Sequence, residues 1–123
     1  MCLYTKNNKP TKLKEDLIVY KVMGKSGPYF ISEYKEFQYK PNKTYRTYRL
    51  KPLWVKYSYP IQEPTYSIHR GFHAYITLET ANKLLNPLTC VIVKCLYPKG
   101  TKVFYGARGK DIVGTRIKIL GEI

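Results

Sequence analysis

The chain has 123 residues, of which 44% are hydrophobic, so it is long enough for one domain with one core and too short for two ordinary domains. No apolar run approaches the roughly 20 residues that a membrane span requires, and the N-terminal stretch lacks the apolar centre of a signal peptide, so we expect a cytoplasmic protein with no membrane partner. The chain carries 22 Lys and Arg against 8 acidic residues, and its formal net charge of +14 favours polyanions, nucleotides or an acidic protein as partners.

Residues 1–14 are mostly polar and basic, which predicts either a loose N-terminal arm or an edge strand, and residues 15–123 are expected to form a single α+β domain. Removal of the initiator methionine would expose Cys2, whose own amine could then act as the base of an N-terminal nucleophile. The alternative for Cys2 is an ordinary buried thiol. With Cys90 and Cys95 the chain has three cysteines in all; they show no metal-like spacing, and the odd count fits reduced thiols better than a disulfide framework.

The first clear strand is Asp16–Met23, DLIVYKVM. Both of its faces are mostly apolar, which is typical of a central strand. The glycine-rich piece that follows, Gly24–Tyr29, lacks the spacing of a phosphate-binding P-loop and predicts a flexible turn. Short aromatic strand fragments are expected in Phe30–Tyr39, before another turn at Pro41–Lys43.

The tract Thr44–Pro60, TYRTYRLKPLWVKYSYP, is the most basic and aromatic part of the chain and contains no acid. Its alternation predicts two strands that are interrupted at Pro52. Guanidinium groups beside aromatic rings are what phosphate contact and base stacking both require, so Arg46, Arg49 and Trp54 are candidate ligand-binding residues. The alternative is a half-buried sheet whose Arg side chains protect its edges.

A strand, Phe72–Ile76, is predicted to run directly into the one convincing helix. Its face with His73 and Tyr75 is the candidate wall of a site. Thr77 can cap the helix through its hydroxyl, and an Asn-Pro pair ends it, so one main helix is expected over about residues 77–86. An apolar stripe at spacings of three and four is expected to face the core, formed by Leu78, Ala81, Leu84 and Leu85.

Thr89–Tyr97 predicts a buried strand, and a tight Pro-Lys-Gly turn is expected to join it in a hairpin to a second strand, Thr101–Tyr105. After the loop Gly106–Lys110, a last strand is predicted over Asp111–Leu120. Its apolar face is expected to be Val113, Thr115, Ile117 and Ile119. Its exposed face is expected to be Ile112, Gly114, Arg116, Lys118 and Leu120.

Two places have the composition of an anion site. In the loop Gly106–Lys110, glycines let backbone amides approach a ligand, and Arg108 and Lys110 add charge, although such loops also arise simply as turns. His73 could donate a hydrogen bond to a phosphate or ribose, with Arg70 close by. The alternative for His73 is a satisfied structural histidine.

Motifs for metal or hydrolytic chemistry are not found in the sequence: it has no paired-carboxylate motif, no metal spacing and no nucleophile elbow. His69 and His73 are four residues apart, which in one extended strand puts them about 13 Å apart, too far to share a metal ion. We therefore expect neither a metal nor a cofactor.

Three stretches carry a resemblance to a known family. LIVYKVM with Tyr20 and Lys21, then GFHAYITLETANKLL, then TCVIVKCLYPKGTKVF resemble the layout of ADP-ribosyltransferase-like domains, and also that of small domains from gut bacteria and their phages. Within the second stretch the matching residues are Gly71, Phe72, His73, Ala74, Thr77 and Ala81. In the transferases these elements surround a nicotinamide dinucleotide, and the final strand carries a catalytic glutamate. Here the segment Gly114–Lys118 contains no acid, so the resemblance implies a nucleotide cleft without the transferase reaction.

The patterns together predict a small α+β protein with a curved, mostly antiparallel sheet or split barrel and one main helix. We expect a basic cleft that binds a phosphorylated ligand, a nucleotide, without turnover. The candidate ligand-binding residues are Tyr20, Arg46, Arg49, Trp54, Arg70, His73, Tyr75, Arg108 and Lys110, the aromatic ones for base stacking and the others for phosphate contact. The resemblance implies a phage protein that captures a nucleotide immune signal in the cytoplasm of a bacterial host cell.

Other readings of the same sequence stay open. The tract over residues 44–59 could instead form an RNA- or DNA-binding module or an interaction module for an acidic protein. A divergent ADP-ribosyltransferase or an N-terminal cysteine enzyme is the catalytic alternative. The plainest alternative is a solvated, lysine-rich surface. A homo-oligomer with sites completed at its interfaces would suit tight capture of a small anion.

Overall fold

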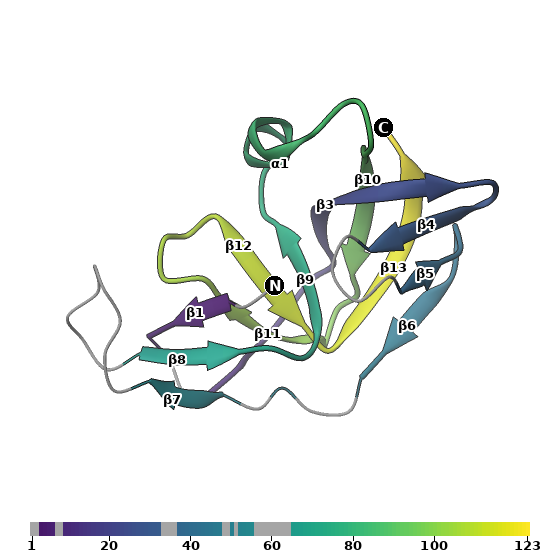
Figure 1. Ribbon diagram of the computed structural model, residues 1–123. Helices are drawn as coiled ribbons and strands as arrows, with labels where there is room; N and C mark the ends of the chain where they lie inside the picture. Colours follow the sequence, from purple (N-terminus) through teal and green to yellow (C-terminus); the bar gives the residue numbers. More distant parts are fainter. Residues whose placement is uncertain (1–2, 7–8, 33–36, 48–49, 51, 56–64) are drawn as a thin grey trace.

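The computed structural model describes all residues except 1–2, 7–8, 33–36, 48–49, 51 and 56–64, and it is mostly antiparallel sheet with a single short helix in the described part (Figure 1). This confirms the predicted α+β class, and the large sheet is open and curved. No helix among the described residues combines the length and the apolar character needed to cross a membrane.

The large sheet follows an order far from that of the sequence, and all its pairings are antiparallel. From one edge to the other its strands are β2 (Thr11–Lys12), β11 (Lys102–Tyr105), β12 (Asp111–Gly114), β9 (Phe72–Tyr75), β3 (Leu17–Ser26), β10 (Val91–Tyr97), β13 (Arg116–Glu122) and β6 (Thr44–Arg46). Two further strands, β4 (Tyr29–Ser32) and β5 (Gln38–Tyr39), extend from the end of β3 through a hairpin at Gly27.

A second, three-stranded sheet combines the N-terminal strand with the middle of the chain. Its order is β1 (Leu3–Thr5), β8 (Thr65–Ile68) and β7 (Leu53–Val55). Leu3 and Ile68 are fully buried, which anchors β1 although it is only three residues long. In Figure 1 this sheet lies beside β12 and β9 at the lower left of the view.

Strand β3 is central, as the sequence predicts, because β10 pairs along one side of it and β4 and β9 pair along the other. Its residues Val19, Lys21 and Met23 are buried. We call the side of the large sheet onto which these three side chains project the inner face, and the opposite side the outer face. Lys21 is thus a basic residue inside an apolar core.

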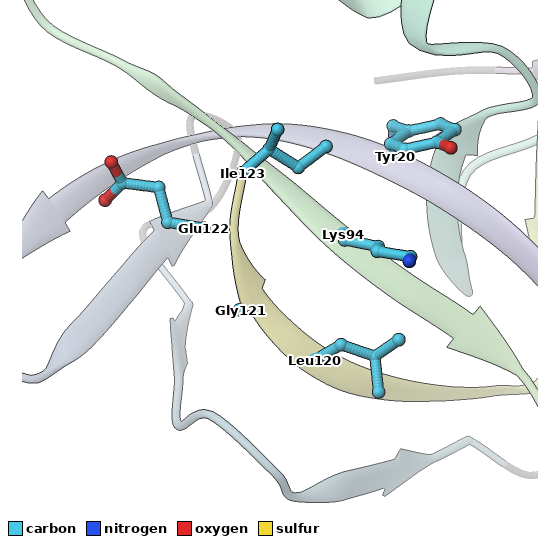
Figure 2. Close-up of a pocket in the computed structure, with 6 residues that line it drawn as sticks. All are labelled: Tyr20, Lys94, Leu120, Gly121, Glu122 and Ile123. Atoms are coloured by element: carbon cyan, nitrogen blue, oxygen red, sulfur yellow. The ribbon is translucent and has the colours of Figure 1, made fainter.

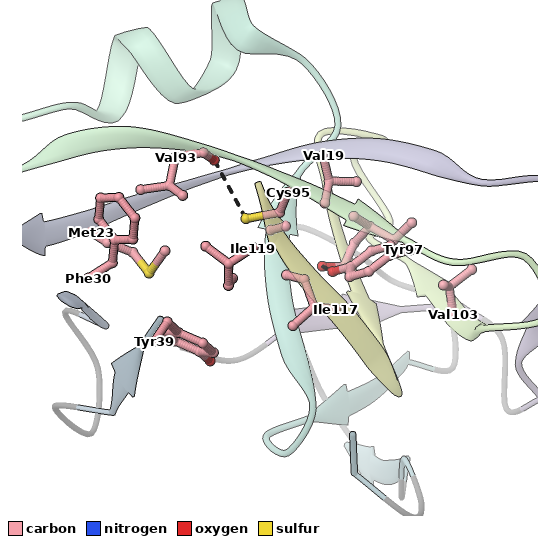
Figure 3. Close-up of a cluster of buried hydrophobic side chains, with 12 residues drawn as sticks. Val19, Met23, Phe30, Tyr39, Val93, Cys95, Tyr97, Val103, Ile117 and Ile119 are labelled. Carbon is pink, nitrogen blue, oxygen red and sulfur yellow. Dashed lines mark hydrogen bonds between the residues drawn. The ribbon is translucent and has the colours of Figure 1, made fainter. Parts of the chain in front are cut away.

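Two apolar clusters lie on opposite faces of the large sheet. The inner-face cluster is drawn in Figure 3 and consists of Val19, Met23, Phe30, Tyr39, Ala74, Val93, Cys95, Tyr97, Val103, Ile112, Ile117 and Ile119. The second cluster joins the two sheets through Leu3, Leu50, Ile68, Phe104 and Val113. The two consecutive β12 residues Ile112 and Val113 are both fully buried because each belongs to a different cluster.

The helix, α1, spans Leu78–Leu84 and begins at the predicted cap, where the Thr77 hydroxyl accepts a hydrogen bond from the Thr80 amide at 3.2 Å. It packs against β3 and β9. Ala81 is fully buried, but Leu84 is 56% exposed. The predicted four-residue stripe is therefore wrong at Leu84, because a helix of only seven residues ends before its last turn can cover the sheet.

The predicted hairpin between Thr89–Tyr97 and Thr101–Tyr105 is wrong. Strands β10 and β11 form at those positions, but β10 pairs with β3 and β13, whereas β11 pairs with β12 and β2. The Pro-Lys-Gly turn is instead held by the N-terminal segment, because the Gly100 amide donates to the Leu13 carbonyl at 2.9 Å and the Leu13 amide donates to Thr101 at 2.9 Å. Backbone groups that a hairpin would use are already satisfied there.

The predicted single last strand is also wrong, because it divides at Thr115 into β12 and β13, which lie in different parts of the sheet. The Thr115 carbonyl accepts a hydrogen bond from the Thr47 amide at 2.8 Å, and its amide donates to Lys102 at 3.1 Å. Beyond this break the prediction holds, since Ile117 and Ile119 are fully buried. Before the break it fails at Ile112 and Gly114, which are buried instead of exposed.

The strands described within the basic and aromatic tract over residues 44–59 belong to different sheets. Strand β6 ends at Arg46 and belongs to the large sheet, while β7 belongs to the small one. The Tyr45 ring points to the inner face, with its centroid 5.0 Å from the Tyr39 ring in an edge-on arrangement. Tyr45 is therefore committed to packing, and Arg46, like Thr44, is exposed.

Candidate functional site

A row of residues crosses the outer face of the large sheet. Tyr20 of β3 is paired with Tyr75 of β9 on one side and with Lys94 of β10 on the other. Residues directly opposite each other in antiparallel strands project from the same face, with Cβ atoms about 5 Å apart. The row continues to Asp111 beyond Tyr75 and to Gly121 beyond Lys94. It thus places two aromatic rings and an ammonium group side by side.

An open pocket of about 350 Å³ lies at the Lys94 end of this row. Its lining residues are Tyr20, Lys94, Leu120, Gly121, Glu122 and Ile123 (Figure 2). In Figure 2 the Tyr20 ring and the Lys94 ammonium lie on one side and the Glu122 carboxylate on the other. A ring, a cation and an aliphatic wall are the groups that a base and a phosphate need.

The two charged residues of the pocket differ in their partners. Glu122 forms an ion pair with Lys25, with 2.9 Å between Nζ and Oε1. Lys94 is exposed and has no ion-pair partner among the described residues. Lys94 is thus the cation of this pocket whose ammonium is available to an anion.

A bulge in β13 shapes the pocket. Cys95 is paired with Ile119 and Lys94 with Gly121, so Leu120 is an extra residue between two consecutive pairs. Gly121 follows at φ 146°, a backbone conformation that other residues rarely adopt. The bulge brings Leu120 and Gly121 together opposite the single residue Lys94.

At the other end of the row, Asp111 lies opposite Tyr75. Partial burial raises the pKa of the Asp111 carboxyl, while its own backbone amide and the charge of Arg108 act in the opposite direction. Arg108 precedes Asp111 by three residues in the loop between β11 and β12.

The loop Gly106–Lys110 has most of its backbone amides in internal hydrogen bonds. The Gly106 amide donates to Asp111 at 2.8 Å, the Ala107 amide to Tyr4 at 2.8 Å, and the Gly109 amide to Gly106 at 2.9 Å. These three amides cannot also surround an anion. The part of the loop that can contact a ligand is therefore the pair of exposed side chains, Arg108 and Lys110.

The remaining predicted residues lie elsewhere or outside the described part of the chain. Arg70 is exposed in the turn between β8 and β9, and Arg46 is on the edge strand β6, three strands away from β3. Arg49 lies outside the described residues, and Trp54 is in β7 of the small sheet, with its side chain outside the description. The structure therefore places Tyr20 beside Tyr75, with the loop that carries Arg108 preceding Asp111 at the end of the row, but it does not gather the described candidates into one cleft.

His73 is 9% exposed, opposite Val113 at the second apolar cluster. The assumption that His69 and His73 share one strand is wrong, because β8 ends at Ile68 and the chain turns at Gly71 with φ 107°. The turn brings His73 Nε2 to 3.2 Å from the His69 carbonyl oxygen. Among the described residues no group of three or more potential metal ligands is found.

Sequence reasoning missed Lys94, which lies opposite Tyr20 in the pocket. One signal could have found it: Lys94 is the single charged residue in the otherwise apolar segment Thr89–Tyr97. A charge on one face of a central strand needs solvent or a ligand on that face.

Comparisons with protein-family models, curated proteins and solved structures gave no match.

Proposed function

We propose that this protein binds a phosphorylated small molecule, a nucleotide, at the outer-face pocket and does not transform it. The observation that supports this function is the direct pairing of Tyr20 with Lys94 on one face of the sheet, within a pocket. In this arrangement the base stacks on Tyr20 and a phosphate contacts the Lys94 ammonium.

The neighbouring residues favour the same ligand chemistry. Tyr75 extends the aromatic surface on the far side of Tyr20. Leu120 and Ile123 offer aliphatic contact to a base or ribose. The net charge of +14 raises the local concentration of any anionic ligand before it reaches the pocket.

Binding without turnover agrees with the state of the pocket carboxylate. Glu122 is paired with the inner-face residue Val93, and one oxygen of its carboxylate is engaged in the ion pair with Lys25. A general acid or base would need this carboxylate to be directed at the ligand. Its commitment to Lys25 instead gives it a structural role at the end of β13.

Isothermal titration calorimetry with adenosine, AMP, ATP and inorganic phosphate tests the proposal. AMP should bind more tightly than either adenosine or phosphate alone, because both halves of the site are then filled. Tyr20→Ala and Lys94→Gln should each weaken AMP binding by roughly 10-fold or more, as expected for loss of base stacking or of a charge-assisted hydrogen bond.

Lys83→Gln is the matched control, because Lys83 is an exposed lysine on α1 that pairs with Glu79 at 3.3 Å. It removes the same charge away from the pocket and should leave the affinity for AMP unchanged. Absence of binding by every compound, or equal binding by wild type and the two pocket variants, would show the proposed function to be wrong.

A further inference from the structure

Basic side chains continue from the pocket across the outer face of the sheet. Ile117 and Ile119 of β13 belong to the inner-face cluster, so the alternating residues Arg116 and Lys118 project from the outer face. Lys118 is paired with Leu96, which is two residues along β10 from Lys94. Three cations therefore follow one another from the pocket toward the far end of β13.

This line of three cations, Lys94, Lys118 and Arg116, reaches the edge strand β6, where Arg116 lies directly opposite Arg46. Like charges in a direct cross-strand pair destabilise a sheet unless an anion lies between them. Arg46 is exposed and Arg116 is half-buried. No ion pair with an acid involves either residue among the described positions.

A glycine turn fixes the end of this line. The Arg116 guanidinium donates to the Lys99 carbonyl at 2.8 Å. Its Nη2 atom would be 3.1 Å from a Cβ at Gly100, and the Cε of Lys12 would be 3.9 Å from the same point. Two cations of different strands thus meet over a residue that has no side chain. The acid at this turn, Asp16, is engaged by the Lys99 amide at 2.7 Å.

The spacing along the line suits a chain of anions. Alternate residues of a strand are roughly 6 to 7 Å apart, which is comparable to the separation of successive phosphates in an extended nucleic acid strand. Lys118 and Arg116 are one such step apart on β13, whereas Lys94 and Lys118 are diagonal neighbours on paired strands, about 7 to 8 Å apart. Tyr20 lies at the pocket end as a surface for base stacking. A mononucleotide would occupy only the first step.

We propose that the outer face from the Tyr20 pocket to the Gly100 turn binds single-stranded nucleic acid, with one nucleotide in the pocket and successive phosphates on Lys94, Lys118 and the Arg116–Arg46 pair. The proposal rests on the proposed function, since it assigns a polymer to the same pocket. Charge complementarity supports a polyanion here, and the aromatic end favours a nucleic acid over an acidic protein.

Fluorescence anisotropy with labelled thymidine nucleotides of one, two, four and eight units tests it. Affinity should rise with length from one to four units, and the salt dependence should steepen as more phosphates are contacted, by about 0.7 in the logarithmic slope for each. Arg46→Gln with Arg116→Gln should weaken the four-unit ligand by at least 10-fold and leave the one-unit ligand unchanged. Lys83→Gln should change neither.

Arg116 also holds the Gly100 turn, so Lys118→Gln is a second variant that removes charge from the line without touching that turn. It should weaken the four-unit ligand by several-fold. Equal affinity for one and four units, no effect of these variants, or equally tight binding of polyglutamate would overturn the nucleic acid proposal while mononucleotide binding at the pocket stood. If no thymidine nucleotide of any length bound, and none of the adenine compounds did, both proposals would be wrong.

Discussion

The ammonium of Lys21 lies 5.8 Å from the centre of the Tyr39 ring, on the same side of the sheet as the buried thiol of Cys95. It also donates a hydrogen bond to the backbone carbonyl of His73 in the neighbouring strand. Burial lowers the pKa of Lys21 to about 8, and the nearby Cys95 acts in the opposite direction. The core of this protein therefore contains a titratable cation.

The first prediction concerns Lys21→Met. Because the pKa of Lys21 is about 8 in the native state and 10.5 in the unfolded chain, the unfolded state binds one more proton between these values, and the contribution of Lys21 to stability rises with pH across that window. From pH 7 to pH 10.5 the free energy of unfolding of wild type should gain about 3 kcal/mol relative to the variant.

Urea denaturation of both proteins at a series of pH values measures this difference. The buried groups whose pKa values burial raises, Tyr39, Tyr97 and Cys95, are present in both proteins, so their effects cancel to first order. A difference in stability that stays constant from pH 7 to pH 10.5 would contradict a lowered pKa for Lys21.

The second prediction concerns Gly71→Ala in the turn before β9. A Cβ there would be 2.4 Å from Leu50 Cδ2 and 2.7 Å from Val113 Cγ2, and the φ of 107° is unfavourable for alanine. We expect a loss of roughly 3 to 5 kcal/mol in the free energy of unfolding. Gly27→Ala is the matched control, because its φ is also positive, 58°, but nothing lies within 4 Å of its Cβ position.

The control variant should lose only about 1 to 2 kcal/mol in the free energy of unfolding, because it has only the cost of a positive φ at an alanine. Thermal and urea denaturation of the two variants measure the contrast. Equal losses would show that the side chains of Leu50 and Val113 move aside at little cost in free energy.

The third prediction concerns Tyr97→Phe. The fully buried Tyr97 hydroxyl lies within hydrogen-bond distance of the Phe72 carbonyl and of the Ile112 carbonyl, the latter at 3.3 Å, so β10 is linked to β9 and β12 across the inner face. Its loss should lower the free energy of unfolding by about 1 to 3 kcal/mol, since it leaves a buried acceptor without a donor. Tyr105→Phe removes an exposed hydroxyl from β11 and should change stability by less than about 0.5 kcal/mol.

The fourth prediction concerns thiol reactivity. Cys95 is fully buried, and burial raises its pKa to about 12, whereas Cys90 is half-exposed. Iodoacetamide at pH 8 should label Cys90 in the native protein and Cys95 only in urea, because the thiolate is the reactive form. Peptide mapping by mass spectrometry distinguishes the two positions, and rapid native labelling of Cys95 would contradict its place in the core.

The sequence predicted local features well where a residue pattern is typical of one kind of structure, such as an apolar strand or a helix cap. Asp16–Met23 forms most of β3, and Thr77 caps α1 as its hydroxyl predicts. Tyr20 and Tyr75, both predicted as aromatic ligand-binding residues, lie directly opposite each other in paired strands. That both project from one face depends on the period of two within each strand and on the register in which β3 and β9 pair.

Long-range pairing could not be predicted in the same way. The Pro-Lys-Gly turn after β10 is typical of a hairpin, but the competing partners of β10 are strands separated from it by tens of residues. Likewise, alternation in Asp111–Leu120 gave one buried face, whereas β12 is covered on both sides by different clusters. The outer face of β12 is covered by the small sheet. No local sequence pattern predicts that the small sheet packs there.

The strand order also has a consequence for the time at which the chain can fold. Strand β3 is synthesised before β10, so its inner-face residues Val19 and Met23 meet Val93 and Cys95 only after β10 has been made, and Ile117 and Ile119 come later still. Strand β13, the last in chain order, lies between β10 and β6. Until it leaves the ribosome, β10 and β6 each have an open edge that can pair with other chains. We therefore expect folding to begin only after β13 has been synthesised, and to be slow, as is usual for sheets built from distant segments.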